Sequence, residues 1–161
     1  MDDRRPNGMV LRGYRVEDLH GLCGLDEVCF GPTFRFNKGS MRRFVERPGA
    51  VVVVAETMAN RELAGFLIVH LEQSGSVWFG YVVTVDVAEE WRRRGVASEL
   101  MDEGERQARK AGAEIMDLHV WTENEGAIRF YEGRGYERMG VRKGFYGRVG
   151  LDAFVYRKVL G

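Results

Sequence analysis

Apolar residues follow two different spacings along the 161-residue chain, and the spacing changes at Gly, Pro and polar turns. Alternating or continuous apolar runs predict seven strands, at residues 10–14, 50–55, 64–71, 77–87, 115–121, 136–142 and 151–159. Apolar residues three or four positions apart predict four helices, at residues 16–30, 41–47, 94–111 and 123–132. The predicted order is β-α-α-β-β-β-α-β-α-β-β, which indicates an α/β domain.

Turn and cap residues set the expected limits of these elements. Gly31-Pro32-Thr33 is expected to end the first helix, and Ser40 to cap the second at its N-terminus. The polar residues 58–61 separate two apolar runs and predict a β-hairpin. Gly112 is expected to end the third helix.

Length, composition and charge restrict the class of protein. A chain of 161 residues with 45% apolar residues suffices for one globular domain, so we expect a single domain over residues 1–161, with residues 1–8 disordered. The formal net charge is zero, which gives no electrostatic reason to bind nucleic acid or an anionic membrane. The residues do not decide between a monomer and a dimer.

Neither a membrane-spanning segment nor a metal site is indicated. No apolar run approaches the roughly 18 residues that a transmembrane helix needs, and residues 1–8 contain no apolar core of a signal peptide. Cys23 and Cys29 lie six positions apart in a predicted helix, without a CxxC motif. A reduced, metal-free, cytoplasmic protein is the simplest interpretation.

The stretch Arg92-Arg93-Arg94-Gly95-Val96-Ala97 joins a predicted strand to a predicted helix. Free backbone N–H groups and the positive end of the helix dipole make such a junction suitable for phosphate. Gly95 lets the backbone approach an anion closely, and the small Ala97 leaves room for it. The spacing Arg-x-x-Gly-x-Ala differs from the P-loop and from the dinucleotide-binding glycine motif. A basic helix start without a ligand is the alternative.

A second block begins 27 residues after Ala97, at Asn124, and runs to Tyr136. Residues 87–97 and 124–136 together resemble the two signature motifs of the GNAT superfamily of N-acetyltransferases. The resemblance is dense over residues 81–156. It implies a single α/β domain that uses acetyl-CoA as acetyl donor. Such a domain has a mixed, mostly antiparallel sheet of about seven strands, about four flanking helices, and central strands that splay apart to hold acetyl-CoA.

The resemblance assigns a group of residues to acetyl-CoA. In the family the pyrophosphate lies on the Arg-x-x-Gly-x-Ala turn, and the pantetheine follows the preceding strand. The corresponding positions are Val85, Val87, Arg92, Arg93, Arg94, Gly95, Val96, Ala97, Ser98, Asn124 and Tyr131. Tyr131 matches the tyrosine that faces the sulfur, as an acid or as a contact of the thiolate; packing against the sheet is its alternative. Asn124 can also cap the following helix.

His119 and Tyr81 are the candidate catalytic base. Alternation along residues 115–121 places His119 on the face opposite Leu118. Ribosomal-protein alanine acetyltransferases carry Glu at the position of His119, whereas the NatE-type catalytic subunit, which acetylates N-termini that begin with Met, carries His. That subunit also has a tyrosine 14 positions before the motif glycine, as Tyr81 stands before Gly95. The resemblance implies a water-mediated base formed by Tyr81 and His119; a structural His is the alternative.

Two loops are expected to bind the acceptor. Phe30 and Pro32 match the helix-to-helix loop that shapes the pocket for the first acceptor residue. Tyr146 matches the second residue of a Tyr-Tyr pair that clamps the substrate backbone, whereas Phe145 replaces the first and lacks its hydroxyl. Ordinary packing is the alternative for Phe30 and Tyr146.

Proton affinity favours an α-amine as acceptor. An α-amino group with a pKa near 7.7 loses its proton at pH 7 at a cost of roughly 1 kcal/mol, against about 4.6 kcal/mol for lysine. A histidine base is adequate only for the first task. The sequence therefore predicts an acetyl-CoA-dependent N-acetyltransferase that acts on a peptide or protein N-terminus by direct attack in a ternary complex. A small-amine acetyltransferase (polyamine, aminoglycoside or amino acid) and a non-catalytic acyl-CoA-binding module are the alternatives.

Overall fold

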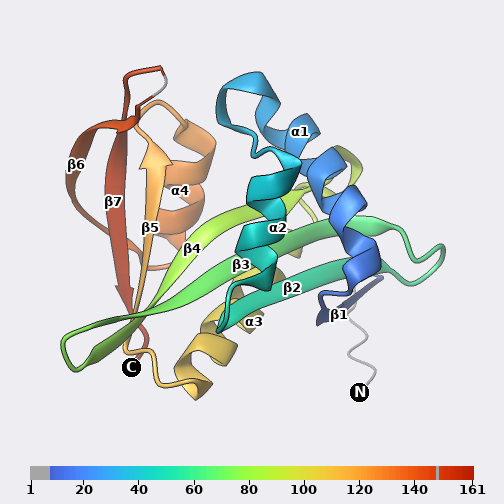
Figure 1. Cartoon of the computed structure of the whole chain (residues 1–161), viewed down its shortest axis with the longest axis horizontal. Helices are drawn as coiled ribbons and strands as arrows, with labels where there is room; N and C mark the ends of the chain where they lie inside the picture. Colours follow the sequence, from blue (N-terminus) through green and yellow to red (C-terminus); the bar gives the residue numbers. More distant parts are fainter. Residues whose placement is uncertain (1–7, 148) are drawn as a thin grey trace.

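The computed structural model describes residues 8–147 and 149–161, so the expected disorder of residues 1–8 lies, apart from Gly8, outside the described residues. Seven strands form one sheet in the order β1-β2-β3-β4-β5-β7-β6 (Figure 1). They are β1 (Met9–Gly13), β2 (Ala50–Thr57), β3 (Leu63–Ser74), β4 (Val77–Val87), β5 (Ile115–Trp121), β6 (Glu137–Tyr146) and β7 (Leu151–Val159). Only β4 and β5 pair in parallel; the other neighbours are antiparallel. The predicted mixed sheet is confirmed.

Four helices flank the sheet. They are α1 (Leu19–Phe34), α2 (Lys38–Glu46), α3 (Val96–Lys110) and α4 (Glu125–Gly133), accompanied by the 3-10 turns η1 (Val16–Asp18) and η2 (Glu89–Trp91). In Figure 1, α1 and α2 lie in front of β2, β3 and β4, while α3 lies behind them. The order of strands and helices is the one that the sequence predicts, although several limits differ.

Strand β3 separates two apolar cores. Its residues 64–70 are all buried, because helices cover both faces. Leu67 and Val69 contact the core beneath α3, whereas Phe66 and Ile68 contact the core beneath α1 and α2. A strand buried on both faces reads as a continuous apolar run in the sequence, which explains why residues 64–70 show no polar alternation.

The cap of α2 and the end of α1 differ from the prediction. Ser40 does not cap α2: the N-cap is Asn37, whose Oδ1 accepts the N–H of Ser40 at 2.8 Å, and the helix begins at Lys38. Asn caps as well as Ser, so the earlier residue takes the role. The break predicted at Gly31 is present as a kink at φ 61°, but a further helical turn follows it and runs to Phe34.

Strands β4 and β5 pair over three residues and then separate. The pairs are Phe79 with Ile115, Gly80 with Met116 and Tyr81 with Asp117. Figure 1 shows the two strands spreading apart from this point. A β-bulge opposite Ile68 and Val69 adds Val83 to β4, and such bulges bend a strand. The expected splayed centre is therefore present, and the edge of β4 that faces β5 has no strand partner beyond Tyr81.

Gly65 of β3 lies beside this opening and has no room for a side chain. A Cβ there would stand 2.7 Å from the backbone oxygen of Asp86 and 3.3 Å from Leu100 Cδ1. We expect Gly65→Ala to lower the free energy of unfolding by about 1–3 kcal/mol, because a backbone carbonyl of the adjacent strand must move. Urea denaturation measures the change. Gly140→Ala in β6, where a Cβ meets nothing within 4 Å, is the control, and equal losses in both variants would contradict the prediction.

Candidate active site

The space between the separated strands is a cleft of about 780 Å³. Residues from α1, β4, α3, β5, α4 and β6 line it. The sequence-predicted site residues found in its lining are Phe30, Val85, Val87, Arg92, Arg93, Gly95, Val96, Ala97, Ser98, His119, Asn124, Tyr131 and Tyr146. Tyr81, Arg94 and the exposed Pro32 are outside the lining. The fold thus gathers in one cleft most of the residues that the sequence singles out.

One end of the cleft is a seat for an anion. Arg93 and Gly95 both adopt left-handed backbone conformations, with φ of 61° and 80°. Gly95 is the N-cap of α3 and provides no side-chain cap. The first N–H groups of the helix are therefore left for a ligand, and the helix dipole favours a negative one. Left-handed residues alternating with right-handed ones also orient successive N–H groups into an anion-binding concavity.

The arginines of this turn have different surroundings. Arg92 Nε donates to Val87 O at 3.1 Å, and its Nη2 lies 3.6 Å from Cys29 Sγ. The guanidinium of Arg94 instead lies 4.8 Å from the centre of the Trp91 ring. Arg92 thus ties the turn to the end of β4, and Arg94 contacts η2 from outside the cleft.

The charge in the cleft has one sign. Arg92, Arg93 and Arg129 line it, and none of the described residues in its lining is Asp or Glu. Arg129 is not among the residues that the sequence predicted for the site. Gly126, three residues earlier on the same face of α4, also lines the cleft and was not predicted either, so helical spacing offered no signal for Arg129.

His119 lies on β5 where the strands part. Its Nδ1 is 2.8 Å from Tyr81 Oη, and its ring stacks on Phe145 with 4.0 Å between centroids and 8° between planes. Tyr81 itself does not line the cleft, so it can act on a bound molecule only through His119. The pair that the resemblance implied is therefore in direct contact, and Phe145, which has no hydroxyl, fixes the imidazole by stacking.

Both rings of this pair are neutral near pH 7. Burial lowers the pKa of His119 below its ordinary value of 6.5; Arg142 lowers it further, and Asp117 opposes the change. Burial raises the pKa of the Tyr81 phenol well above its ordinary value of 10. When Nδ1 carries the imidazole hydrogen and donates it to Tyr81 Oη, Nε2 keeps a lone pair that can accept a proton.

Tyr131 and Asn124 reach the cleft from α4. Tyr131 is 6% exposed, and burial, followed by the nearby Asp86, raises the pKa of its phenol well above 10. It therefore stays protonated at neutral pH and can donate a hydrogen bond. Asn124 is the N-cap of α4, since its Oδ1 accepts the N–H of Ala127 at 3.1 Å. The capping role of Asn124 is thus real, and the same residue lines the cleft.

The other end of the cleft is aromatic. Phe34 lies 5.3 Å from Trp121 and 4.9 Å from Tyr146, measured between ring centroids. We call these three side chains the aromatic wall. It joins α1, β5 and β6, three elements that are distant in sequence. Phe34 was not predicted, because the kink at Gly31 interrupts the helical spacing that would have revealed it.

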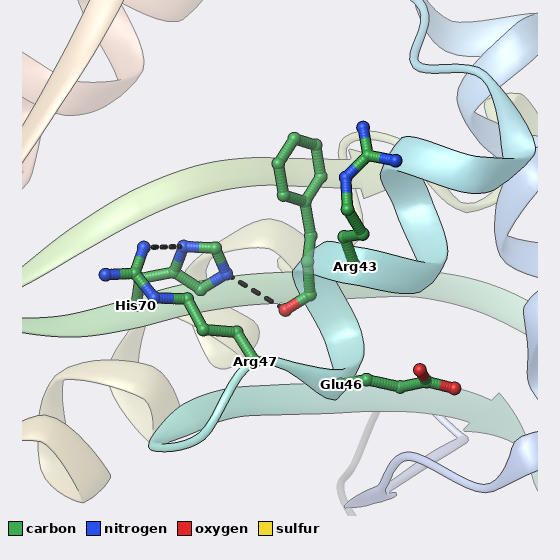
Figure 2. Close-up of a pocket in the computed structure, with 5 residues that line it drawn as sticks. Arg43, Glu46, Arg47 and His70 are labelled. Atoms are coloured by element: carbon green, nitrogen blue, oxygen red, sulfur yellow. Dashed lines mark hydrogen bonds between the residues drawn. The ribbon is translucent and has the colours of Figure 1, made fainter.

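A second depression of about 520 Å³ lies over α2 and β3. Figure 2 shows that Arg43 and Glu46 point away from His70. The imidazole is fully engaged: Nε2 contacts Phe44 O at 2.9 Å and Nδ1 contacts Arg47 at 3.1 Å. Because neither ring nitrogen is open to a substrate, this group ties α2 to β3 and offers no reactive centre.

Residues 8–147 and 149–161 lack two kinds of structural feature. None of the helices there combines the length and apolar character needed to cross a membrane. Nowhere in the same residues do three or more His, Cys, Asp or Glu side chains gather as a metal ion requires.

Two curated proteins show the sequence relationship. The N-terminal acetyltransferase B complex catalytic subunit naa20 of Schizosaccharomyces pombe is 32% identical over 116 residues, which are 70% of this chain and 64% of the relative. This chain thus spans less than two thirds of that relative. The N-alpha-acetyltransferase of Saccharolobus solfataricus is 34% identical over 160 residues, which are 94% of this chain and 93% of the relative.

Solved structures agree with the fold. Naa20 of Chaetomium thermophilum, in complex with a bisubstrate analogue, has a TM-score of 0.77 at 30% identity, over 92% of this chain and 85% of that one. NAA60 of Arabidopsis thaliana, in complex with acetyl-CoA, has a TM-score of 0.82 at 21% identity, over 94% and 98%. The similarity to NAA60 is evidence for the fold alone.

The family assignment rests on sequence and architecture together. The profile of the acetyltransferase (GNAT) family matches residues 19–136, which include the Arg-x-x-Gly-x-Ala turn, both separated strands and α4. This chain is a member of the acetyltransferase (GNAT) family.

Proposed function

We propose that the protein is an acetyl-CoA-dependent N-acetyltransferase that acetylates the free α-amino group of a peptide or protein N-terminus. One observation carries the proposal: a single cleft combines a backbone seat for phosphate, a neutral imidazole where the strands part, and an aromatic wall without carboxylates. The names of the Saccharolobus and Schizosaccharomyces relatives support it. Both cysteines are free, which favours a reducing compartment such as the cytoplasm.

The donor is assigned to the β4 side of the cleft. The pyrophosphate lies on the turn before α3, held by backbone N–H groups from Arg93 to Ser98 and by the positive charges of Arg92, Arg93 and Arg129. The pantetheine follows Val85 and Val87, where the free edge of β4 supplies peptide groups for hydrogen bonds. Arg94 supports the turn from outside through Trp91.

The reaction is a direct transfer. The neutral amine attacks the thioester carbonyl carbon while His119 Nε2 accepts a proton from its nitrogen, directly or through water; the C–S bond then breaks and the CoA thiolate leaves. Tyr81 orients the imidazole through the bond to Nδ1 and is a positioning residue. Tyr131 donates a hydrogen bond to the leaving sulfur. Because the pKa of its phenol is raised, Tyr131 keeps its proton while it donates this bond.

The acceptor is assigned to the aromatic wall and Phe30. An oligocation such as a polyamine or aminoglycoside would find no carboxylate among the described lining residues and would meet three arginines there instead. A peptide N-terminus carries a single amine that is partly neutral at pH 7. The lining therefore favours the peptide over the polycationic small amines.

The phosphate seat is tested by Gly95→Asp, with Gly95→Asn as its uncharged match. Both substitutions add a similar side chain at a left-handed residue, but only Asp places an anion where the pyrophosphate lies. We expect the acetyl-CoA Kd of the Asp variant to exceed that of the Asn variant at least about tenfold. Isothermal titration calorimetry measures both. Equal dissociation constants would remove the seat from this turn.

The electrostatics of the base are tested by titrating the His119 ring by NMR. We expect a pKa below 6.5, so the imidazole loses its ability to accept a proton as the pH falls through that value. Arg142→Gln removes a positive charge that disfavours the imidazolium, so it should raise the pKa. Arg106→Gln on α3, across the sheet, is the control. A His119 pKa above 6.5, or equal responses to both substitutions, would refute the assignment.

The acceptor is tested by thiol release from acetyl-CoA. The panel contains peptides with free N-termini and different first residues, an N-terminally blocked peptide with a lysine, spermidine and an aminoglycoside. We expect turnover only with free N-termini, and His119→Ala should lower kcat about 100-fold with little change in the acetyl-CoA Kd.

The other outcomes of this panel are informative. Turnover confined to the small amines would replace the proposal with the small-amine alternative. No turnover on any acceptor, with acetyl-CoA still bound, would indicate a non-catalytic acyl-CoA-binding module. Unchanged kcat in His119→Ala would make that residue structural.

A further inference from the structure

Two carboxyl groups are buried beside the cleft and have no part in the reaction described above. Asp26 of α1 is 0% exposed, and Asp86 of β4 is 1% exposed. The two side chains lie close enough to interact across the contact between α1 and β4. Two ionised carboxylates in contact and away from water would repel strongly, so one of them holds a proton.

The hydrogen bonds of the pair leave one place for that proton. Asp26 Oδ2 accepts the N–H of Phe36 at 2.8 Å, and Asp86 Oδ1 accepts the hydroxyl of Thr84 at 2.5 Å. The remaining oxygens, Asp26 Oδ1 and Asp86 Oδ2, are buried and lack any other partner in the described part of the chain. One proton between these two oxygens satisfies both of them.

The groups around the pair do not offset the cost of burying two ionised carboxylates. Cys23, Cys29 and Tyr131 face the pair and are neutral near pH 7, since burial raises the pKa of each. Arg92 is the cation that acts on Asp86. Its effect is smaller than that of burial, which raises the pKa of Asp86 well above the ordinary carboxyl value.

The pair joins two parts of the cleft. Asp26 precedes the kink at Gly31 and Phe36 follows it, so their bond closes the kinked segment against α1. This segment carries Phe34 and Phe36, which line the acceptor end of the cleft. Asp86 stands in β4 between two cleft-lining valines and points to the opposite face of the strand.

We propose that Asp26 and Asp86 share one proton and act as a positioning pair, which fixes the acceptor end of the cleft relative to the donor strand β4. The kinetic part rests on the proposed function, whereas the shared proton does not. When the proton is lost at alkaline pH, two anions face each other, α1 and its kinked segment move away from β4, and the acceptor loses Phe34 and Phe36. The phosphate seat, at the other end of the cleft, keeps its geometry.

The shared proton is tested by infrared spectroscopy at pH 7, where ordinary carboxyl groups are ionised. We expect the C=O stretch of one protonated carboxyl group in the unmodified protein, and its loss in both Asp26→Asn and Asp86→Asn. In each variant the amide N–H₂ replaces the proton and donates to the carboxylate that is left. Absence of the band from the unmodified protein, or its persistence in both variants, would overturn the proposal.

The positioning role is tested by comparing Asp26→Ala with Asp26→Asn. Loss of the bond to Phe36 in the Ala variant should raise the KM for the peptide about tenfold while the KM for acetyl-CoA stays within about twofold. Asp26→Asn, which keeps an oxygen for Phe36, should stay within about twofold for both. His20→Ala, at an exposed position of the same helix, is the control and should match the unmodified protein. Equal rises in both KM values would reduce Asp26 to a structural residue.

The pH dependence separates the pair from other titrating groups. The peptide KM of the unmodified protein should rise at alkaline pH, and that of Asp26→Asn should not, because its amide does not titrate. Parallel profiles would refute the proposal. If no peptide is acetylated, hydrogen exchange at the Phe36 amide still tests the positioning role. Exchange should be faster in Asp26→Ala than in Asp26→Asn and His20→Ala. Equal rates would overturn the positioning role, independently of the proposed function.

Discussion

The separation of β4 from β5 after three pairs is the constraint on which the site depends. Buried backbone groups in a sheet are almost always paired, so an unpaired edge in the middle of a sheet requires a ligand or water. The sheet nevertheless holds together, because β3 pairs with β4 and β7 pairs with β5 along their length. The extra Val83 bends β4, and the same strand ends at the turn that precedes α3. Donor strand and phosphate seat are therefore consecutive parts of one segment.

Burial then determines which groups along the cleft are neutral. It lowers the pKa of the His119 imidazole and raises those of the Tyr81 and Tyr131 phenols, so all three are neutral in the part of the cleft where we propose that the transfer takes place. The positive charges lie at the other end of the cleft, on the arginines beside the phosphate seat. A protonated amine would gain no charge–charge attraction from these neutral side chains. Under the proposed function, this arrangement favours an acceptor that loses its proton at low cost, which describes an α-amine better than lysine.

Much of this could be predicted from the sequence because the decisive signals are local. The strand, the Arg-rich turn and the helix after Gly95 are contiguous, and strand alternation is enough to orient His119. The sequence did not reveal the aromatic wall or the carboxyl pair, because Phe34 and Asp86 meet their partners only across tertiary contacts. Asp26 in particular reads as one more polar position on an amphipathic helix. Its complete burial follows from how α1 lies on β4, which spacing does not encode.

The kink at Gly31 explains why the acceptor end needs support. The segment after the left-handed Gly keeps one helical bond, from Arg35 N–H to Gly31 O at 3.1 Å, but the chain becomes extended at Arg35 and the N–H of Phe36 needs a partner elsewhere. Asp26 supplies one for Phe36, and the bond reaches back across ten positions. An ionised Asp26 would accept the same bond more strongly, yet it would then face Asp86 in a space that excludes water. The shared proton resolves this conflict, since it keeps an acceptor for the backbone and removes the repulsion between the carboxyl groups. The geometry of the acceptor end thus depends on a group that never contacts the acceptor.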